Sequence, residues 1–247
     1  MEAISCLSTQ ILDKPSPEEG AVYLWCSHLD RSPQDVQALL LTLSDDERVR
    51  ADRFCFQVDR TRCIVRRGLL RVILGSYLHI EPSSLCFCYG PQGKPRLALT
   101  NHDQELHFNV SHSNNLALLA FSWQRRIGVD IEAMRPVPDL ESVSKLVFST
   151  RENVGFHLLP SEQQMEAFFD SWTCKEGYLK ATGEGLSQAP SEIELSLLPG
   201  GGVRLLSVKG SQQEAKRWYL ASFSPARGYK AALVVEGIEC RVQHISM

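Results

Sequence analysis

The chain has 247 residues, of which 43% are hydrophobic and 22% charged, and its formal net charge at pH 7 is -3. This composition is typical of a folded globular protein, and the near-neutral charge argues against a general attraction to nucleic acids or membranes. None of the eight cysteines stands in a C-x-x-C pair, so neither a disulfide framework nor a zinc site is predicted. The first residues show no basic segment followed by an apolar one, so we expect a cytoplasmic protein that is not bound to a membrane.

The predicted elements of the first half are a strand, three helices and two hairpins. A strand is expected over 22–29 and a short helix over 34–41. Ser44 begins the next helix, because acidic residues fill the turn that follows it. A long helix pattern closes near Gly75. Stretches rich in apolar and β-branched residues around Gly, Pro and Asn then predict extended segments within 84–99, 106–122 and 125–134.

The second half repeats this order. Ser149 and Glu152 form the capping box of a helix start, and a long helix over 168–182 ends at a glycine. Two strand–turn–strand patterns follow, over 192–208 and 217–237. The segment RGLLR matches EGYLK at an offset of about 109, and the later hairpins match at a similar offset.

This internal repeat predicts an α+β fold built from two similar α/β halves related by pseudo-two-fold symmetry. Each half is expected to be a long helix packed on a small, mostly antiparallel sheet. The boundary is expected between residues 1–123 and 124–247.

Two acids in one predicted strand are the first chemical signal. Asp130 and Glu132 are two residues apart, so they project to the same face of the strand. Such carboxylates repel each other and are costly to desolvate unless a cation joins them, and hard oxygen ligands favour Mg²⁺. The alternatives are an exposed strand face or pairing with arginines.

A helical stripe of mixed charge is the second signal. Trp172, Glu176 and Lys180 lie four residues apart on one face of the predicted helix, with Lys175 beside them. Taken alone, this pattern is typical of a surface helix with a Glu–Lys pair. If the helix packs beside the strand of Asp130, three carboxylates and two ammonium groups converge, which predicts a magnesium ion bound together with an anion such as pyrophosphate.

Adjacent Ser111 and His112 do not indicate a serine hydrolase, because neighbours on a strand point to opposite faces. A phosphate contact from His112, or a plain turn, fits better. Lys94 stands on the stiff Gly-Lys-Pro turn, from which an ammonium can reach a phosphate. The most basic region is rich in arginine and suits the phosphates of a nucleotide cofactor, an acidic protein partner or a solvated face; its arginines are Arg48, Arg50, Arg53, Arg60, Arg62, Arg66, Arg67 and Arg71.

From about residue 44 to residue 230, the ordered motifs resemble those of the 4'-phosphopantetheinyl transferases. The resemblance is to the larger, pseudo-dimeric type that activates peptide and polyketide synthetases, the surfactin-synthetase-activating type. The motifs that carry it are GKP, FNVSHS, GVDIE, FSTRE, WTCKEGYLK and GYKAAL.

The resemblance implies an activity, cofactors and partners. Enzymes of this family move the 4'-phosphopantetheine arm of coenzyme A onto a serine of an apo acyl or peptidyl carrier protein and release adenosine 3',5'-bisphosphate. By the same resemblance we expect Mg²⁺, with Mn²⁺ as an alternative, and coenzyme A as co-substrate. We also expect a monomer that serves polyketide, nonribosomal peptide or fatty acid synthesis and binds no nucleic acid.

The resemblance also implies roles for individual residues. The expected metal ligands are Asp130, Glu132 and Glu176. The expected contacts to coenzyme A are Arg50, Arg62, Lys94, Ser111, His112, Lys175 and Lys180, of which His112 and the last two neutralise pyrophosphate oxygens. Glu47 departs from the family, which often has a basic residue there, and puts part of the 3'-phosphate contact in doubt.

The base that takes the proton of the carrier serine is left open between Glu176, Glu152 and a water, and Lys180 is expected to act beside it in catalysis. The segment 148–168 is expected to be either a carrier-docking surface or part of the core. A rival hypothesis is a non-catalytic module that uses the arginine-rich helix to hold an acidic partner. Another magnesium-dependent phosphotransferase lacks support, because the sequence has no phosphate-binding loop of the G-x-x-x-x-G-K-[ST] type.

Overall fold

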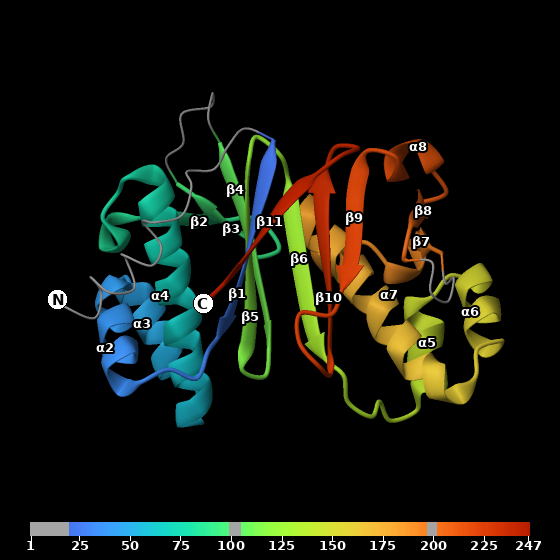
Figure 1. The fold of residues 1–247 in the computed structure, drawn as a ribbon, viewed down its shortest axis with the longest axis horizontal. Helices are drawn as coiled ribbons and strands as arrows, with labels where there is room; N and C mark the ends of the chain where they lie inside the picture. Colours follow the sequence, from blue (N-terminus) through green and yellow to red (C-terminus); the bar gives the residue numbers. More distant parts are fainter. Residues whose placement is uncertain (1–19, 99–104, 197–201) are drawn as a thin grey trace.

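In the computed structural model, two sheets pack face to face between two layers of helices (Figure 1). The structure describes residues 20–98, 105–196 and 202–247. The first half comprises β1 (Ala21–His28), α2 (Pro33–Thr42), α3 (Asp45–Asp52), α4 (Gln57–Leu78), β2 (Phe87–Tyr89), β3 (Pro95–Leu97), β4 (Leu106–Ser113) and β5 (Leu116–Trp123). The second half comprises β6 (Ile127–Ala133), α5 (Leu140–Val147), α6 (Thr150–His157), α7 (Ser161–Thr182), β7 (Ile193–Leu195), β8 (Leu205–Val208), α8 (Gln212–Ala215), β9 (Trp218–Phe223), β10 (Tyr229–Glu236) and β11 (Arg241–Ser246).

Strand order is the same in the two main sheets, apart from one added strand. The first sheet runs β11-β1-β5-β4 and the second β6-β10-β9. In each half a strand is followed by helices, a short hairpin and a longer hairpin, which confirms the predicted α+β fold class. The exception is β11, which belongs to the second half by sequence but pairs in parallel with β1. The two-fold relation and the boundary near residue 124 remain predictions.

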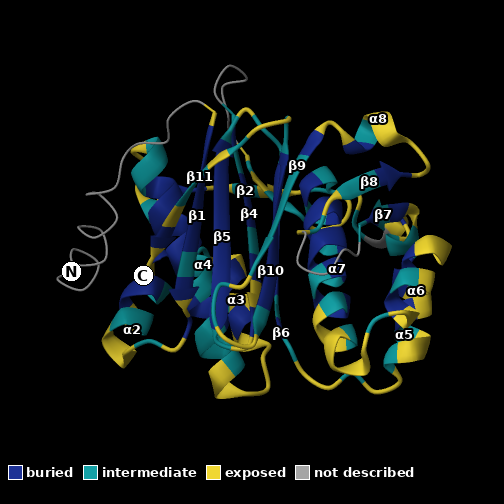
Figure 2. Cartoon of the chain, turned by 45° about the vertical axis from the view of Figure 1, so that its right-hand side comes forward, coloured by how far each residue is buried: buried dark blue, intermediate teal, exposed yellow. Residues whose placement is uncertain are grey.

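The central strands β1 and β5 of the first sheet are apolar on both faces because both faces are covered. Tyr23 and Trp25 of β1 are fully buried on the side of α4, whereas Val22 and Leu24 pack against the second sheet. Figure 2 shows this buried centre flanked by helices whose outer faces are exposed. Within the described residues, no helix is both long enough and apolar enough to cross a membrane.

The long helix α4 does not close at Gly75 as the sequence predicts. It runs on to Leu78, and His79 then adopts the left-handed conformation with φ of 55°. A Cβ on Gly75 would lie 2.6 Å from the carbonyl oxygen of Ile80. This glycine therefore leaves room for the chain that folds back after the helix, and it does not end the helix. By contrast α7 ends as predicted, at Gly183 with φ of 79°. The glycine-rich turn predicted within 192–208 falls largely on residues 197–201, outside the described part of the chain.

Helix α7 lies directly against strand β6, and Gly128 is the residue that permits this. A Cβ on Gly128 would lie 2.1 Å from the carbonyl oxygen of Gly177 and 2.3 Å from the backbone nitrogen of Ala181. Both are backbone atoms and cannot swing aside. The contact therefore sets the distance between the strand that carries Asp130 and the helix that carries Lys180.

We predict that Gly128→Ala lowers the free energy of unfolding by about 3 kcal/mol, because the added methyl forces α7 away from β6. Gly177→Ala is the matched control on the facing helix. Its Cβ would meet a side-chain methyl of Val234 at 3.2 Å, and no backbone atom closer than 3.6 Å, so the gain in helix propensity, up to about 1 kcal/mol, offsets the tighter contact. Urea denaturation of both variants measures the difference; equal stabilities would contradict the account.

Candidate active site

Polar side chains of β4 join the first sheet to the second. Asn109, Ser111 and Ser113 are two residues apart and share one face of the strand. Asn109 Oδ1 accepts from the backbone N–H of Val129 at 2.9 Å, and Ser113 Oγ accepts from that of Ala133 at 3.0 Å. These bonds hold β4 alongside β6 through side chains, and in the described part of the chain the two strands belong to separate sheets.

Asp130 is the buried centre of the site. Its side chain lies on β6, and its Oδ1 accepts from Ser111 Oγ at 2.8 Å and from Lys180 Nζ at 2.5 Å. Lys180 Nζ also lies 3.0 Å from Ser111 Oγ, so three elements meet at this point. The second carboxylate oxygen, Oδ2, is buried and has no hydrogen-bond partner among the described residues. An orphaned buried oxygen of this kind commonly marks a place where an ion or a water binds.

Two further carboxylates surround Asp130. Glu132 accepts from Ser113 Oγ at 3.0 Å. Burial and then the charge of Asp130 raise the pKa of Glu132. Burial likewise raises the pKa of Glu176, with Lys180 opposing the shift and both other acids adding to it. The predicted trio on β6 and α7 is thus close enough for its charges to interact.

The donor chemistry of this trio fits a hard divalent ion, since oxygen ligands and uncompensated negative charge are what Mg²⁺ prefers. The free Oδ2 of Asp130 supports this fit. Across residues 20–98, 105–196 and 202–247, however, no three His, Cys, Asp or Glu side chains form a ready-made metal cage. Lys180 is the cation that contacts Asp130 in this arrangement.

Two adjoining cavities connect this cluster to the arginine-rich helix. The smaller, about 240 Å³, is lined by Glu176 and Lys180. The larger, about 440 Å³, is lined by Arg50, Arg66 and Arg67. The two cavities share four lining residues, Gly93, Pro95, Asn109 and Val110. A long anionic ligand can therefore reach from the arginines to the carboxylate cluster.

Models of two families match consecutive parts of the chain. The 4'-phosphopantetheinyl transferase superfamily matches residues 126–234, and the N-terminal domain of 4'-phosphopantetheinyl transferases matches residues 28–124. The 4'-phosphopantetheinyl transferase HetI of Nostoc sp. is 44% identical over 87% of this chain and 88% of its own length. The chain belongs to the 4'-phosphopantetheinyl transferase family.

Other members of the family are more distant. The 4'-phosphopantetheinyl transferase Sfp of Bacillus subtilis is 27% identical over 83% of this chain and 88% of its own. The crystal structure of the holo-[acyl-carrier-protein] synthase of Thermotoga maritima aligns with 20% identity and a TM-score of 0.35 over 46% of this chain and 63% of that one. Such a TM-score is too low to support conclusions about this fold. The resemblance to the larger, Sfp-like transferases is confirmed by the sequence matches.

Lys175 and Glu152 do not lie in the cluster that Asp130, Glu176 and Lys180 form in this transferase. Lys175 Nζ is fully buried and donates to Glu152 Oε2 at 2.7 Å and to the carbonyl oxygen of Val147 at 2.9 Å. Glu152 also accepts from the backbone N–H groups of Ser149 and Leu195. Successive helical residues differ by about 100° in direction, so Lys175 points into the α5–α6 side while Glu176 points to the cavity.

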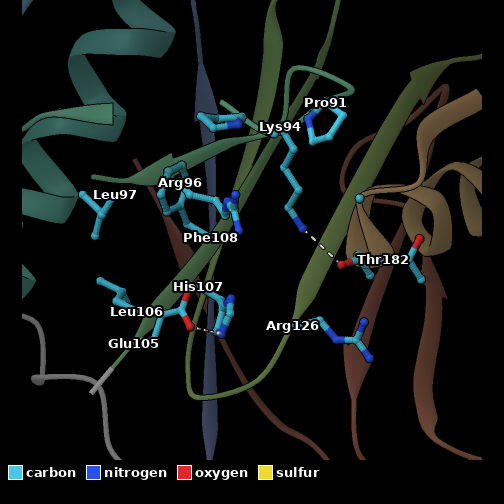
Figure 3. Close-up of a pocket in the computed structure, with 14 residues that line it drawn as sticks. Pro91, Lys94, Arg96, Leu97, Glu105, Leu106, His107, Phe108, Arg126 and Thr182 are labelled. Carbon is cyan, nitrogen blue, oxygen red and sulfur yellow. Dashed lines mark hydrogen bonds and ion pairs between the residues drawn. The ribbon is translucent and has the colours of Figure 1, made fainter. Parts of the chain in front are cut away.

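Lys94 is held by backbone carbonyl groups. Its Nζ donates to the carbonyl oxygens of Ile127 at 3.0 Å, Lys180 at 2.5 Å and Ala181 at 3.2 Å. Figure 3 shows the side chain reaching from its loop toward the end of α7, along a cavity of about 290 Å³. Burial, and then Arg126 and Arg96, lower its pKa to about 8. The lysine thus ties the first half to the last turn of the helix that carries Lys180.

The predicted arginine contacts are mostly engaged with protein groups. Arg62 makes a two-point contact with Asp30, at 2.8 and 3.1 Å. Arg50 lies over the ring of Tyr89 and lines the larger cavity. Glu47, the residue that departs from the family, is buried and pairs with the two arginines Arg67 and Arg71. Glu47 therefore neutralises positive charge at the wall of the larger cavity.

His112 lies on the opposite face of β4 from Ser111, as strand alternation predicts. Its Nδ1 is 3.4 Å from Arg66 Nη1. Desolvation by neighbouring protein atoms, and then Arg66, Lys180 and Arg62, lower its pKa to about 4. The sequence patterns gave no role to Asn109 or Ser113, and they included Arg66 only as one member of the arginine-rich region. The alternating N-x-S-x-S pattern in FNVSHS is the signal that could have identified the first two.

We predict that Lys175→Met lowers the free energy of unfolding by about 3–5 kcal/mol, because it leaves the Glu152 carboxylate buried without a cation. The double variant Lys175→Met/Glu152→Gln removes both charges and is expected to recover much of this loss. Chemical denaturation monitored by circular dichroism measures both. A single variant as stable as the wild type would contradict the buried-pair account.

Proposed function

We propose that the cluster of Asp130, Glu132, Glu176 and Lys180 is the centre at which this chain transfers the 4'-phosphopantetheine arm of coenzyme A to a serine of an apo carrier protein. The main support is the continuity between this cluster and the arginine-lined cavity. Coenzyme A carries a diphosphate between its nucleotide and its pantetheine arm. The arginine-lined cavity and the cluster suit the two ends of that anionic portion.

The chemistry follows from charge. The serine Oγ attacks the β-phosphorus, the bond from that phosphorus to the bridging oxygen breaks, and adenosine 3',5'-bisphosphate leaves with the electron pair. Mg²⁺, or Mn²⁺ in its place, would be held by Asp130, Glu132 and Glu176 and would supply positive charge to the diphosphate oxygens. Lys180, at the same point, stabilises the charge that gathers on the leaving phosphate. Ser111 holds both Lys180 and Asp130 in position.

Glu176 is the better candidate for the base that takes the serine proton. It is half-buried and lines the smaller cavity, where a hydroxyl can approach. Both oxygens of Glu152 are already occupied by Lys175 and backbone N–H groups. We therefore assign Glu152 and Lys175 a structural role in this proposal, and Lys94 a role in holding α7.

The remaining expectations belong to the same proposal. They are a magnesium-dependent activity, a cytoplasmic monomer, and two halves, residues 1–123 and 124–247, related by pseudo-two-fold symmetry. The repeated strand order of the two sheets supports the last of these. A cleft supplied with residues by both halves of one chain is consistent with a monomer.

We propose that the carrier docks on α5 and α6. Within the segment 148–168, Phe156 is core, at 1% exposure, but Leu158 is 80% exposed. Leu146 and Val154 are exposed nearby, and the basic residue Arg151 is 78% exposed at its side chain. Apolar side chains beside a basic one suit an acidic carrier with an apolar helix face.

Asp130→Asn is expected to lower kcat/KM for carrier modification at least about 100-fold, because the neutral amide loses its attraction for a cation. Intact-protein mass spectrometry of an apo carrier mixed with coenzyme A and Mg²⁺ measures the transfer. Asp52→Asn, in an exposed ion pair with Arg60, is the matched control and should leave the rate unchanged. Wild-type turnover by Asp130→Asn would exclude the proposed role, and no mass gain by the wild type on several carriers would refute the function.

Leu158→Ser is expected to lower kcat/KM for the carrier about tenfold while the KM for coenzyme A stays the same. Ile238→Ser is the control, because Ile238 is equally exposed, at 84%, but lies between β10 and β11. Steady-state kinetics with each substrate varied in turn gives both constants. Equal carrier kinetics for the two variants would place docking elsewhere.

A further inference from the structure

A third cavity, of about 290 Å³, lies beside the two cavities of the proposed active centre. It shares only Lys94, Pro95 and Gly183 with the smaller cavity, and only Pro95 with the larger one. On β4 it is lined by residues 106–108, whereas residues 109–110 line the other two. The third cavity is therefore a separate space, and no group of the proposed reaction occupies it.

Positively charged side chains from both halves line the third cavity. Lys94 and Arg96 come from the first half and Arg126 from the second. Arg126 makes a two-point contact with Glu236, at 2.8 and 2.9 Å. In the described part of the chain, by contrast, the side chain of Arg96 has no hydrogen bond and no ion pair, and Figure 3 shows it extending into the cavity. Arg96 is therefore a cation that a ligand can contact.

The charges around the third cavity do not cancel at pH 7. Two carboxylates face the three cations, Glu105 in the lining and the Glu236 that Arg126 binds. Lys94 keeps its proton, since its pKa is about 8. His107 adds no charge, because burial lowers its pKa below the ordinary value. Three positive and two negative side chains leave one positive charge, which a monovalent anion would balance.

Most of the remaining lining is apolar. It includes Pro91, Pro95, Leu97, Leu106, Phe108 and Ala181. Leu106 and Phe108 belong to the core of the first half, so this wall is fixed. Since a cavity of about 150 Å³ holds benzene, the third cavity has room for about ten non-hydrogen atoms. An apolar wall of this size beside a free guanidinium suits an organic anion better than an inorganic one.

We propose that the third cavity binds a monocarboxylate with an apolar body, about ten non-hydrogen atoms in all, at a site separate from that of coenzyme A. The planar carboxylate matches the fork of N–H groups on Arg96. Its apolar body lies against Leu97 and Phe108. Because residues 181–183 of the second half complete the lining, the ligand contacts both halves of the chain.

Isothermal titration of the full chain with sodium octanoate, which has the proposed size and charge, tests the site. We expect one octanoate to bind per chain with a Kd of about 0.1–1 mM. Octan-1-ol has the chain without the charge, and acetate has the charge without the chain. Each is expected to bind at least about tenfold more weakly. Either one binding as tightly as octanoate would contradict the proposed ligand class.

Substitution of Arg96 locates the binding. Arg96→Gln is expected to weaken octanoate binding about tenfold, and Arg96→Lys, which keeps the charge but loses the fork, by less. The matched control is Arg227→Gln. Arg227 is also exposed, but it lies between β9 and β10 and lines none of the three cavities. This control should bind octanoate as the wild type does, and circular dichroism verifies that each variant is folded.

A titration with octanoate in saturating coenzyme A and Mg²⁺ shows whether the sites are separate, and we expect unchanged affinity. Displacement of octanoate by coenzyme A would place it in the active centre and overturn the proposal. A wild type that binds no octanoate, or an Arg96→Gln variant that binds it normally, would do the same even if the chain modifies carriers. Arg96-dependent binding by a chain that modifies no carrier would support this site and refute only the transferase proposal.

Discussion

The backbone of α7 touches the backbone of β6 at Gly128, and the geometry of the proposed active centre depends on that contact. Asp130 lies two residues further along β6, and Glu176 and Lys180 lie on the facing helix α7. Since neither backbone can retreat, the acids and the lysine are held together despite the cost of gathering like charges. Lys94 reinforces the contact from the other half by bonding to the carbonyl groups at the end of the helix.

Repulsion within the acidic cluster is balanced by groups from two elements. Lys180 comes from the helix, whereas the hydroxyls of Ser111 and Ser113 come from a strand of the first sheet. The bonds that join the two sheets are thus also the bonds that orient the carboxylates. The same side chains contribute to stability and to the proposed chemistry, so substitutions where β4 meets β6 will affect both.

Much of the architecture could be predicted from local patterns. Helical spacing located α4 and α7, and alternation located the hairpins, because both are set by backbone geometry within a few residues. The meeting of Asp130 with Lys180 also followed, since the family resemblance supplied the long-range adjacency that local patterns lack. Local patterns did not predict the direction in which a side chain points from its helix, or the pairing of strands that are far apart in the sequence. Lys175 is adjacent to Glu176 in sequence, yet its burial depends on which side of α7 the later segments cover.

Strand β11 was missed for a related reason. Its sequence, RVQHIS, alternates only weakly, and its partner β1 lies more than two hundred residues earlier in the chain. Parallel pairing over such a separation leaves almost no local trace. Helix α5 was missed as well, because it lacks the Ser-x-x-Glu capping box that marks α3 and α6, helices of the same length, and begins instead at Asp139 in the left-handed conformation.

The same strand has a consequence for how the protein is made. On the ribosome, the first half emerges complete with its helices long before residues 241–246 are translated. Until then one margin of β1 has no neighbour, and such a margin readily pairs with foreign strands. The nascent first half therefore carries an open sheet edge until residues 241–246 have been made and can pair with β1.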